Sequence, residues 1–178
     1  MKRTATLLFL AVLALALGSC SSQTDTSEGT VLLSVTDFDG LPSSISAGAG
    51  PTTIGEITLR NIAKDPSGTT SDLQSIELRS YEIRFARRDT GTRVPPPFVQ
   101  SIFSLVPVNG TATITNLPFL TESQLRNPPL SDLAEDGVDP ETGSEVIMLN
   151  VSMRFFGRTL SGDDIASETA SFTVEVVP

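Results

Sequence analysis

The stretch Ile147-Met148-Leu149-Asn150-Val151-Ser152-Met153-Arg154-Phe155 places a large apolar side chain at every odd-numbered position. A period of two is typical of a strand with one buried and one solvated face. Phe172, Val174 and Val176 repeat the pattern near the end of the chain. These two segments therefore predict two long strands of a sheet.

Five earlier segments carry the same period and are separated by clusters of Gly, Pro, Asn, Asp and Ser. They are Thr30–Phe38, Gly55–Ile62, Leu73–Arg88, Phe103–Val108 and Thr111–Leu117. The third is long enough for one bent strand or two. This series of short strands separated by turn residues resembles that of immunoglobulin-like and fibronectin type III-like sandwiches. We expect an all-β fold, an antiparallel immunoglobulin-like β-sandwich of about seven strands with one short helical excursion.

Two local signals refine this expectation. Asn109-Gly110 predicts a tight hairpin, because a type I′ turn needs positive φ at both central positions. Pro107 lacks a backbone donor, so its strand is expected at a sheet edge or at a bulge. The helical excursion is expected within residues 120–144, where Thr121 and Gln124 have the spacing of a capping box.

The composition excludes several classes of chemistry. The chain has 178 residues, no His, no Trp and a single Cys. Nucleophile pairs that use His, Cys/His zinc sites and an internal disulfide are therefore excluded. Carboxylate pairs remain for glycoside hydrolysis, but the chain is poor in aromatic residues that stack on sugars. We expect no enzymatic activity and no cofactor.

The first twenty residues have the layout of an export signal. Lys2 and Arg3 precede the apolar run Leu7–Leu17, which is too short to span a bilayer. The next residues, Leu17-Gly18-Ser19-Cys20, resemble the lipobox of bacterial lipoproteins. The resemblance implies cleavage before Cys20 and a diacylglyceryl group on its sulfur. The alternative is an ordinary secreted protein with an incidental cysteine.

The resemblance divides the chain into three parts. Residues 1–19 are expected to be a cleaved signal peptide, residues 20–29 a lipidated cysteine with a flexible tether, and residues 30–178 the sandwich. Ser21 is not the Asp associated with inner-membrane retention in enteric bacteria. We therefore expect the outer membrane if the organism has one, and otherwise the outer face of the cytoplasmic membrane.

The sandwich region is similar to small uncharacterised envelope lipoproteins that have an Arg-rich middle strand and a Phe-Gly-Arg sequence near the last hairpin. Here those residues are Phe156, Gly157 and Arg158. This resemblance implies no activity.

Charge excludes one class of partner and leaves two candidate sites. The chain has 21 Asp and Glu against 12 Lys and Arg, so no nucleic-acid partner is expected. The richest acidic cluster comprises Asp132, Glu135, Asp136, Asp139 and Glu141. It lacks the EF-hand spacing, so it is either a solvated loop, which we favour, or a calcium or small-ligand site; no metal ligand is assigned.

A locally basic group stands inside this acidic chain: Arg79, Arg84, Arg87, Arg88 and Arg93. It either meets an acidic partner or a lipid headgroup, or it pairs with the chain's own acids, which we favour. Six phenylalanines are expected in the core: Phe38, Phe98, Phe103, Phe119, Phe155 and Phe172.

The sequence thus predicts a lipid-anchored, non-enzymatic envelope protein, an interaction or structural module of unknown partner. The Pro-interrupted strand edge and the excursion at 120–144 are the surfaces expected to meet an envelope protein. The alternative is a calcium- or small-ligand-binding domain that uses the acidic loop 132–141.

Overall fold

A computed structural model describes residues 29–178. Its strands are β1 (Val31–Asp39), β2 (Ser44–Ser46), β3 (Thr52–Ala63), β4 (Ile76–Arg87), β5 (Phe98–Val106), β6 (Thr111–Leu120), β7 (Ile147–Thr159), β8 (Asp164–Ala166) and β9 (Ala170–Val177). Its helices are η2 (Asp72–Gln74), α2 (Glu122–Leu125) and α3 (Leu130–Asp136). Seven of the described strands have eight or more residues, while β2 and β8 have three each. The expected all-β class is confirmed.

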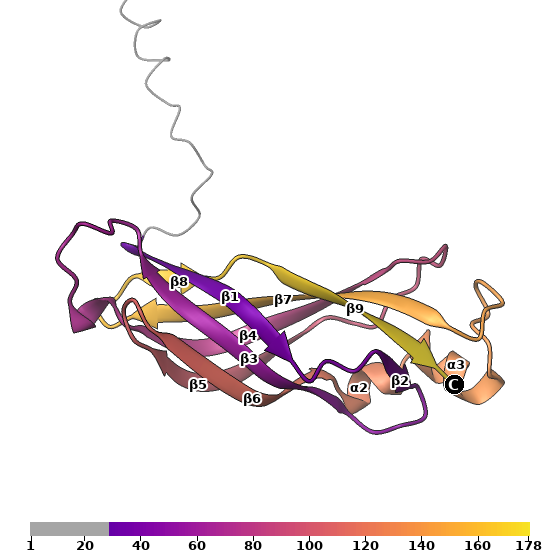
Figure 1. Cartoon of the computed structure of the whole chain (residues 1–178). Helices are drawn as coiled ribbons and strands as arrows, with labels where there is room; N and C mark the ends of the chain where they lie inside the picture. Colours follow the sequence, from indigo (N-terminus) through magenta and orange to yellow (C-terminus); the bar gives the residue numbers. More distant parts are fainter. Residues whose placement is uncertain (1–28) are drawn as a thin grey trace, which may run out of the picture.

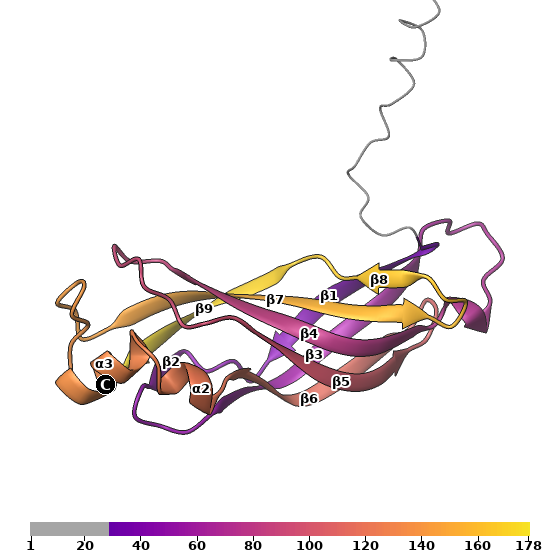
Figure 2. The same ribbon diagram turned by 180° about the vertical axis from the view of Figure 1, so that it is seen from behind.

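The strands form two sheets that face each other along an elongated domain (Figures 1 and 2). One sheet has the order β1-β3-β6, and the other has the order β2-β9-β7-β4-β5, with β8 added beside β7. Every pairing is antiparallel except that of β2 with β9. This is a β-sandwich compatible with an immunoglobulin-like domain.

The core lies between the two sheets and follows the alternation seen in the sequence. On β7, each odd-numbered side chain from Ile147 to Phe155 is fully buried. Leu78, Tyr81 and Ile83 of the neighbouring β4 are also fully buried. The opposing sheet contributes buried apolar side chains from all three of its strands, β1, β3 and β6. Inward apolar and outward polar residues on β4 and β7 therefore assign one face to the core and the other to solvent.

Tyr81 connects the two sheets where their edges meet. Its hydroxyl lies 2.7 Å from the carbonyl oxygen of Pro118 on β6 and 3.0 Å from Oε1 of Gln100 on β5. The ring packs edge-on against Phe98, with centroids 6.2 Å apart. Burial raises the pKa of the Tyr81 hydroxyl above its ordinary value, so the group remains a neutral hydrogen-bonding partner at physiological pH.

The predicted hairpin at Asn109-Gly110 is wrong. The strands on either side belong to different sheets, because β5 pairs with β4 and β6 pairs with β3. Asn109 has the positive φ of 53° that the motif favours, and the N–H of Gly110 donates to the carbonyl of Pro107 at 3.0 Å. The residues therefore form a local turn that carries the chain from one layer to the other.

Other strand boundaries also differ from expectation. The strand expected from Phe103 is β5, which begins at Phe98, and Pro107 lies just beyond its end. This strand is an edge strand, as expected from Pro107. Residues 41–51, between the first two expected strands, contain the short strand β2, which pairs in parallel with β9. Residues 73–88 contain one long strand, β4, preceded by η2.

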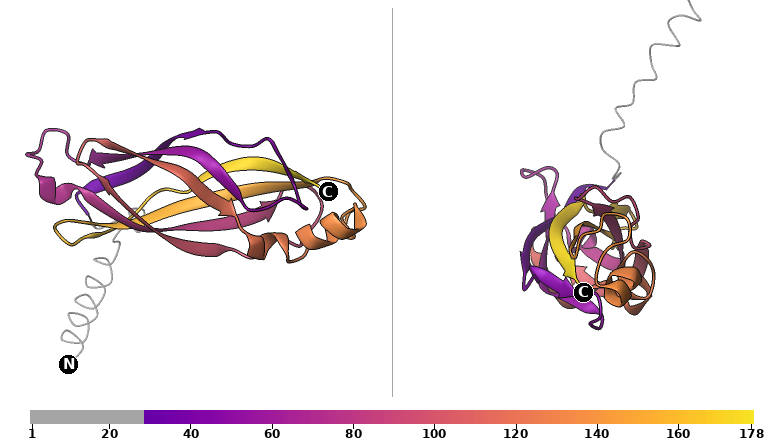
Figure 3. Two further views of the ribbon diagram at one scale, coloured as in Figure 1. Left: turned by 90° about the horizontal axis from the view of Figure 1, so that it is seen from below. Right: turned by 90° about the vertical axis from the view of Figure 1, so that its right-hand side faces the viewer.

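The helical excursion is confirmed as α2 and α3, which close one end of the sandwich (Figure 3). Thr121 and Gln124 form the expected capping box. Leu125, Leu130 and Leu133 are buried with the core cluster. The excursion is therefore part of the hydrophobic core rather than a detachable surface loop.

Gly157 on β7 gives a test of the tight contact between β4 and β7. A Cβ at this position would lie 2.5 Å from the carbonyl oxygen of Glu77 and 3.0 Å from Cγ2 of Ile76. We predict that Gly157→Ala lowers the free energy of unfolding by about 1–3 kcal/mol, because the two strands must separate to admit the methyl group. Urea unfolding measures the change.

Gly48→Ala is the matched control, because the nearest side-chain atom to its added Cβ lies at an ordinary 3.8 Å. Equal stability of the two variants would show that the close approach at Gly157 is not a constraint.

Candidate functional site

Three residues of the acidic cluster and two of the arginines meet at the end of the sandwich that carries α3. Arg87, at the end of β4, has a side chain only 3% exposed. Its Nε lies 2.6 Å from Oδ1 of Asp89, and its Nη2 lies 2.8 Å from Oδ2 of Asp139, which is fully buried. Asp89 also accepts from the backbone N–H of Met148 at 3.0 Å. One guanidinium thus joins the end of β4 to two loops, and Asp89 links the first of these loops to the start of β7.

The network continues outward from Arg87. Glu141 accepts from the backbone N–H groups of Thr92 and Arg93, at 2.8 and 3.0 Å. The guanidinium of Arg93 lies 3.0 Å from Oδ2 of Asp132 on α3. The loop after β4 is therefore held against α3 and the acidic loop by charged hydrogen bonds, which are stronger than neutral ones.

These contacts shift the pKa values of the carboxyl groups. Burial by itself raises the pKa of Asp139, but hydrogen bonds from Arg87 and Thr142 outweigh it and hold the pKa below its ordinary value. Asp89 behaves in the same way through Arg87 and the backbone of Met148. Backbone and hydroxyl donors of Arg93 and Thr92 lower the pKa of Glu141. All three groups are held as carboxylates.

The arrangement has the geometry of an internal ion-pair network rather than of an open cation site. Asp132, Asp139 and Glu141 are brought together, but around arginines. Glu135 and Asp136 lie apart from this network, at the end of α3. Within residues 29–178, no group of three or more acids is arranged to hold a metal ion.

The arginines of the sequence divide into two sets. Arg87 and Arg93 belong to the network, while Arg79, Arg84 and Arg88 lie on the outer face of the six-stranded sheet. The favoured expectation of internal pairing is confirmed for Arg84, whose Nη2 lies 2.8 Å from Glu82, and more weakly for Arg79, which is 4.0 Å from Glu77. Arg88 instead donates to the hydroxyl of Thr173 at 2.9 Å.

Two further arginines on β7, Arg154 and Arg158, join this outer face. We call Arg79, Arg84, Arg88, Arg154 and Arg158 the arginine face. It holds five of the ten Lys and Arg between residues 29 and 178. Arg154 is held in place, because its Nε donates to the carbonyl of Ser167 at 3.0 Å and its guanidinium lies 5.4 Å from the ring centre of Phe156.

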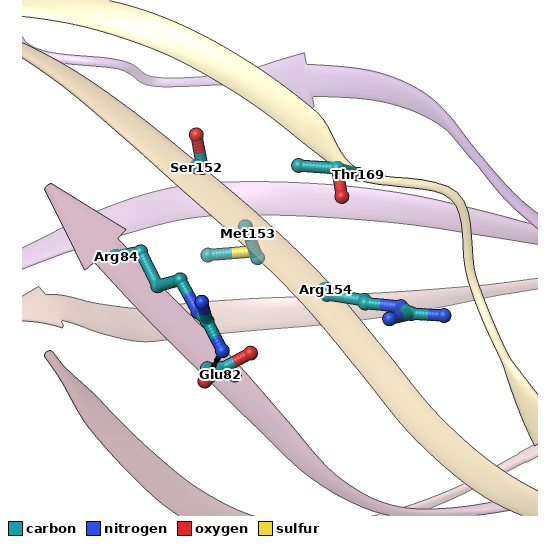
Figure 4. A pocket seen from close by; sticks show the side chains of 6 residues that line it. All are labelled: Glu82, Arg84, Ser152, Met153, Arg154 and Thr169. Atoms are coloured by element: carbon teal, nitrogen blue, oxygen red, sulfur yellow. Dashed lines mark ion pairs between the residues drawn. The ribbon is translucent and has the colours of Figure 1, made fainter. Parts of the chain in front are cut away.

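Two shallow hollows lie on this face. The first, of about 200 Å³, is shown in Figure 4, where Glu82 and Arg84 of β4 turn toward each other and Arg154 extends from β7. Ser152, Met153 and Thr169 complete its lining. The second, of about 330 Å³, lies farther along β7 beside Phe156 and Gly157. Both are open, polar-rimmed depressions rather than enclosed ligand cavities.

The edge strand β5 borders the arginine face and is exposed along its outward side. Val99, Phe103 and Leu105 are 65%, 82% and 48% exposed. The expectation that Phe103 belongs to the core is wrong, because odd-numbered positions of β5 face solvent. The other five phenylalanines pack in or against the core, as expected. Three large apolar side chains in one row on an edge strand mark a candidate interaction surface.

The other sheet edges of the described chain carry features that discourage pairing with another molecule. β1 has Asp37 and Asp39 and a register shift, and β6 contains Pro118. β2 and β8 have only three residues each. By contrast, β5 is nine residues long, with no charge and no proline.

The Pro-interrupted edge expected from the sequence belongs to this surface, but its full length and its exposed apolar row were not predicted. The expected strand begins at Phe103 and so leaves out residues 98–102. Read whole, Phe-Val-Gln-Ser-Ile-Phe-Ser-Leu-Val is the signal, since every odd position except 101 is a large apolar residue, and the even positions also include apolar residues. A strand apolar on both faces suggests burial on both, and only the sheet order shows that one face is open.

The expected lipidation site, Cys20, lies outside the described residues, as do residues 1–19 and all of the tether except Gly29. Within residues 29–178, none of the helices has the length and apolar character needed to cross a membrane. Comparison with known proteins identifies no relative, since no family model, no curated protein and no solved structure matches the chain.

Arg87→Leu tests the network. We predict a loss of about 3–5 kcal/mol in the free energy of unfolding at pH 7, because Asp139 would remain buried without its partner. Arg84→Leu, on the same strand but in an exposed ion pair, should cost less than about 1 kcal/mol. Urea unfolding of both variants measures the difference, and equal losses would contradict the prediction.

The same comparison has a predicted pH dependence. A carboxyl whose pKa is lowered by folding stabilises the folded state at pH values above its ordinary pKa of 3.8. This contribution is lost as the pH falls through the pKa of the folded state. The stability gap between the unmodified protein and Arg87→Leu should therefore narrow as the pH falls below about 4. A gap that is constant down to the acid transition would exclude the linkage.

Proposed function

We propose that this protein is a lipid-anchored, non-enzymatic component of a bacterial envelope, and that its sandwich is an interaction module. The lipobox resemblance at Leu17-Gly18-Ser19-Cys20 supports the anchor. The absence of His and the assignment of the single Cys to lipid support a non-enzymatic role. Two or three acyl chains on Cys20 bind a bilayer almost permanently, whereas one is marginal.

The observation that carries the interaction role is the edge strand β5. Its outward side chains are exposed, it has no charge, and none of the features that guard the other edges interrupts it except one register shift opposite Leu78 and Ser80. An exposed edge of this kind accepts an additional strand, with backbone hydrogen bonds for affinity and side chains for specificity. The arginine face beside it adds the residue type most enriched, together with aromatics, at protein interfaces.

The excursion at 120–144 is a less suitable surface than expected. Leu130 and Leu133 are fully buried in the core cluster, so its loss would remove core side chains and disturb folding. The proposed site is therefore β5 together with the arginine face.

Cys20→Ser tests the anchor. We predict that the variant moves from the membrane fraction to the soluble fraction and no longer incorporates labelled fatty acid, because the thioether cannot form on a hydroxyl. Fractionation and metabolic labelling of expressing cells measure both effects. Cys20→Ala should behave in the same way, and continued acylation of either variant would contradict the proposal.

A photoreactive phenylalanine analogue at Phe103 tests the interaction role in intact cells. We predict a discrete cross-linked product after irradiation, because this side chain is 82% exposed on the proposed contact strand. The same analogue at Leu73, which is 57% exposed in η2 and outside the strands of both sheets, is the matched control. No product at position 103, or equal products at both positions, would contradict the interaction role.

A further inference from the structure

The strand β5 has the properties required for pairing with an identical strand. When two copies of one strand pair antiparallel about a two-fold axis, a charge near the axis lies close to the same charge of the other copy, and like charges that lie close together are destabilising. None of the nine residues of β5 is charged. In a chain with 21 acidic and 12 basic residues, two copies repel over most of their surfaces. The strand β5 is a place where they can approach without that cost.

The strand next to β5 also suits a second copy. The outward side chains of β4 alternate in sign along Glu77, Arg79, Glu82 and Arg84. The border of the contact strand is therefore locally neutral in an acidic domain. An approaching copy therefore meets no run of like charges there.

The side-chain pattern favours one register. In an antiparallel pair centred on Ile102, Val99 of one copy lies opposite Leu105 of the other, and Phe103 lies beside Ser101. All nine residues of β5 then find partners. The outward row, which is open to solvent in a single copy, gains two apolar pairs, and each Phe103 ring lies over a small neighbour.

Symmetry makes this pairing compatible with a common membrane. Two edge strands that extend one sheet are related by a two-fold axis normal to that sheet, so both copies keep Gly29 on the same side of the paired sheet. Two anchored copies can then share one bilayer. Confinement to a membrane raises the effective concentration, which allows a small contact to form.

We infer that β5 pairs antiparallel with β5 of a second copy of this chain, in the register centred on Ile102, to form one continuous sheet across two molecules. This inference rests on the proposed function, because it names the partner of the proposed interaction strand. It is a symmetric, closed contact of the type most common among homodimers.

A pair of cysteines tests the register in the full-length lipidated protein in membranes. In the double variant Val99→Cys with Leu105→Cys, opposed Cα atoms lie about 4.5–5.5 Å apart, within the range of a disulfide. Mild oxidation should give a covalent dimer. The two positions within one copy lie about 20 Å apart along the strand, so no internal bond can form.

The single variants Val99→Cys and Leu105→Cys are the matched controls, because in this register neither residue meets itself. We expect at least a several-fold lower dimer yield from each. No dimer from the double variant, or the same yield from the singles, would overturn the proposed pairing.

Phe103→Lys provides a second measurement that does not depend on oxidation. It places a charge on an exposed position, so the melting temperature should be unchanged, while like charges of the two copies meet near the dyad. Resonance energy transfer between labelled copies reconstituted in one bilayer should fall, and Leu73→Lys should leave it unchanged. Transfer no higher than that of unpaired copies before any substitution would overturn the inference.

The product mass from the photoreactive analogue at Phe103 separates this inference from the proposed function. A product of twice the chain mass supports both. A product with a different protein overturns the second-copy pairing and leaves the interaction role standing. No product at all overturns both.

Discussion

The pairing of β4 with β7 holds together the centre of the larger sheet and sets which of its faces is buried. Eleven registered pairs run from Ile76 and Thr159 to Arg87 and Leu149. The register shifts once, between Leu78 and Ser80. Because side chains alternate across a sheet, the register from Ser80 onward places Tyr81 and Phe155 in the core and leaves Glu82 and Arg154 outside. The same ladder therefore creates both the hydrophobic interior and the polar outer face.

The ends of this ladder explain two further features. At one end, Gly157 lets the strands approach so closely that a methyl group would meet the carbonyl of Glu77. At the other end, Arg87 forms the last pair of the ladder, and its guanidinium binds Asp89 and Asp139. The arginine compensates the burial of Asp139, which would otherwise be costly. The acidic loop is thus bound to the sheet by charge, although much of it is irregular backbone.

The functional surface follows from the position of β5 at the end of the same sheet. β5 pairs with β4 on one side, and no ladder joins it to β6, although Tyr81 contacts both strands near their meeting point. Its inward side chains complete the core, while its outward side chains face solvent beside the arginine face. A strand that is needed for folding therefore also has a free edge, which is the physical basis of the proposed pairing.

Most strands, the capping box at Thr121 and Gln124, and the all-β class could be predicted from the sequence, because they depend on side-chain period and local hydrogen bonds. Three other features depend on packing between distant segments: Asn109-Gly110 joins two sheets, Arg87 is buried with Asp139, and Phe103 is exposed. The turn residues act over four positions, whereas sheet membership depends on packing between distant strands. Likewise, the apolar side chain of Phe103 favours burial, but its exposure depends on where β5 lies in the sheet order.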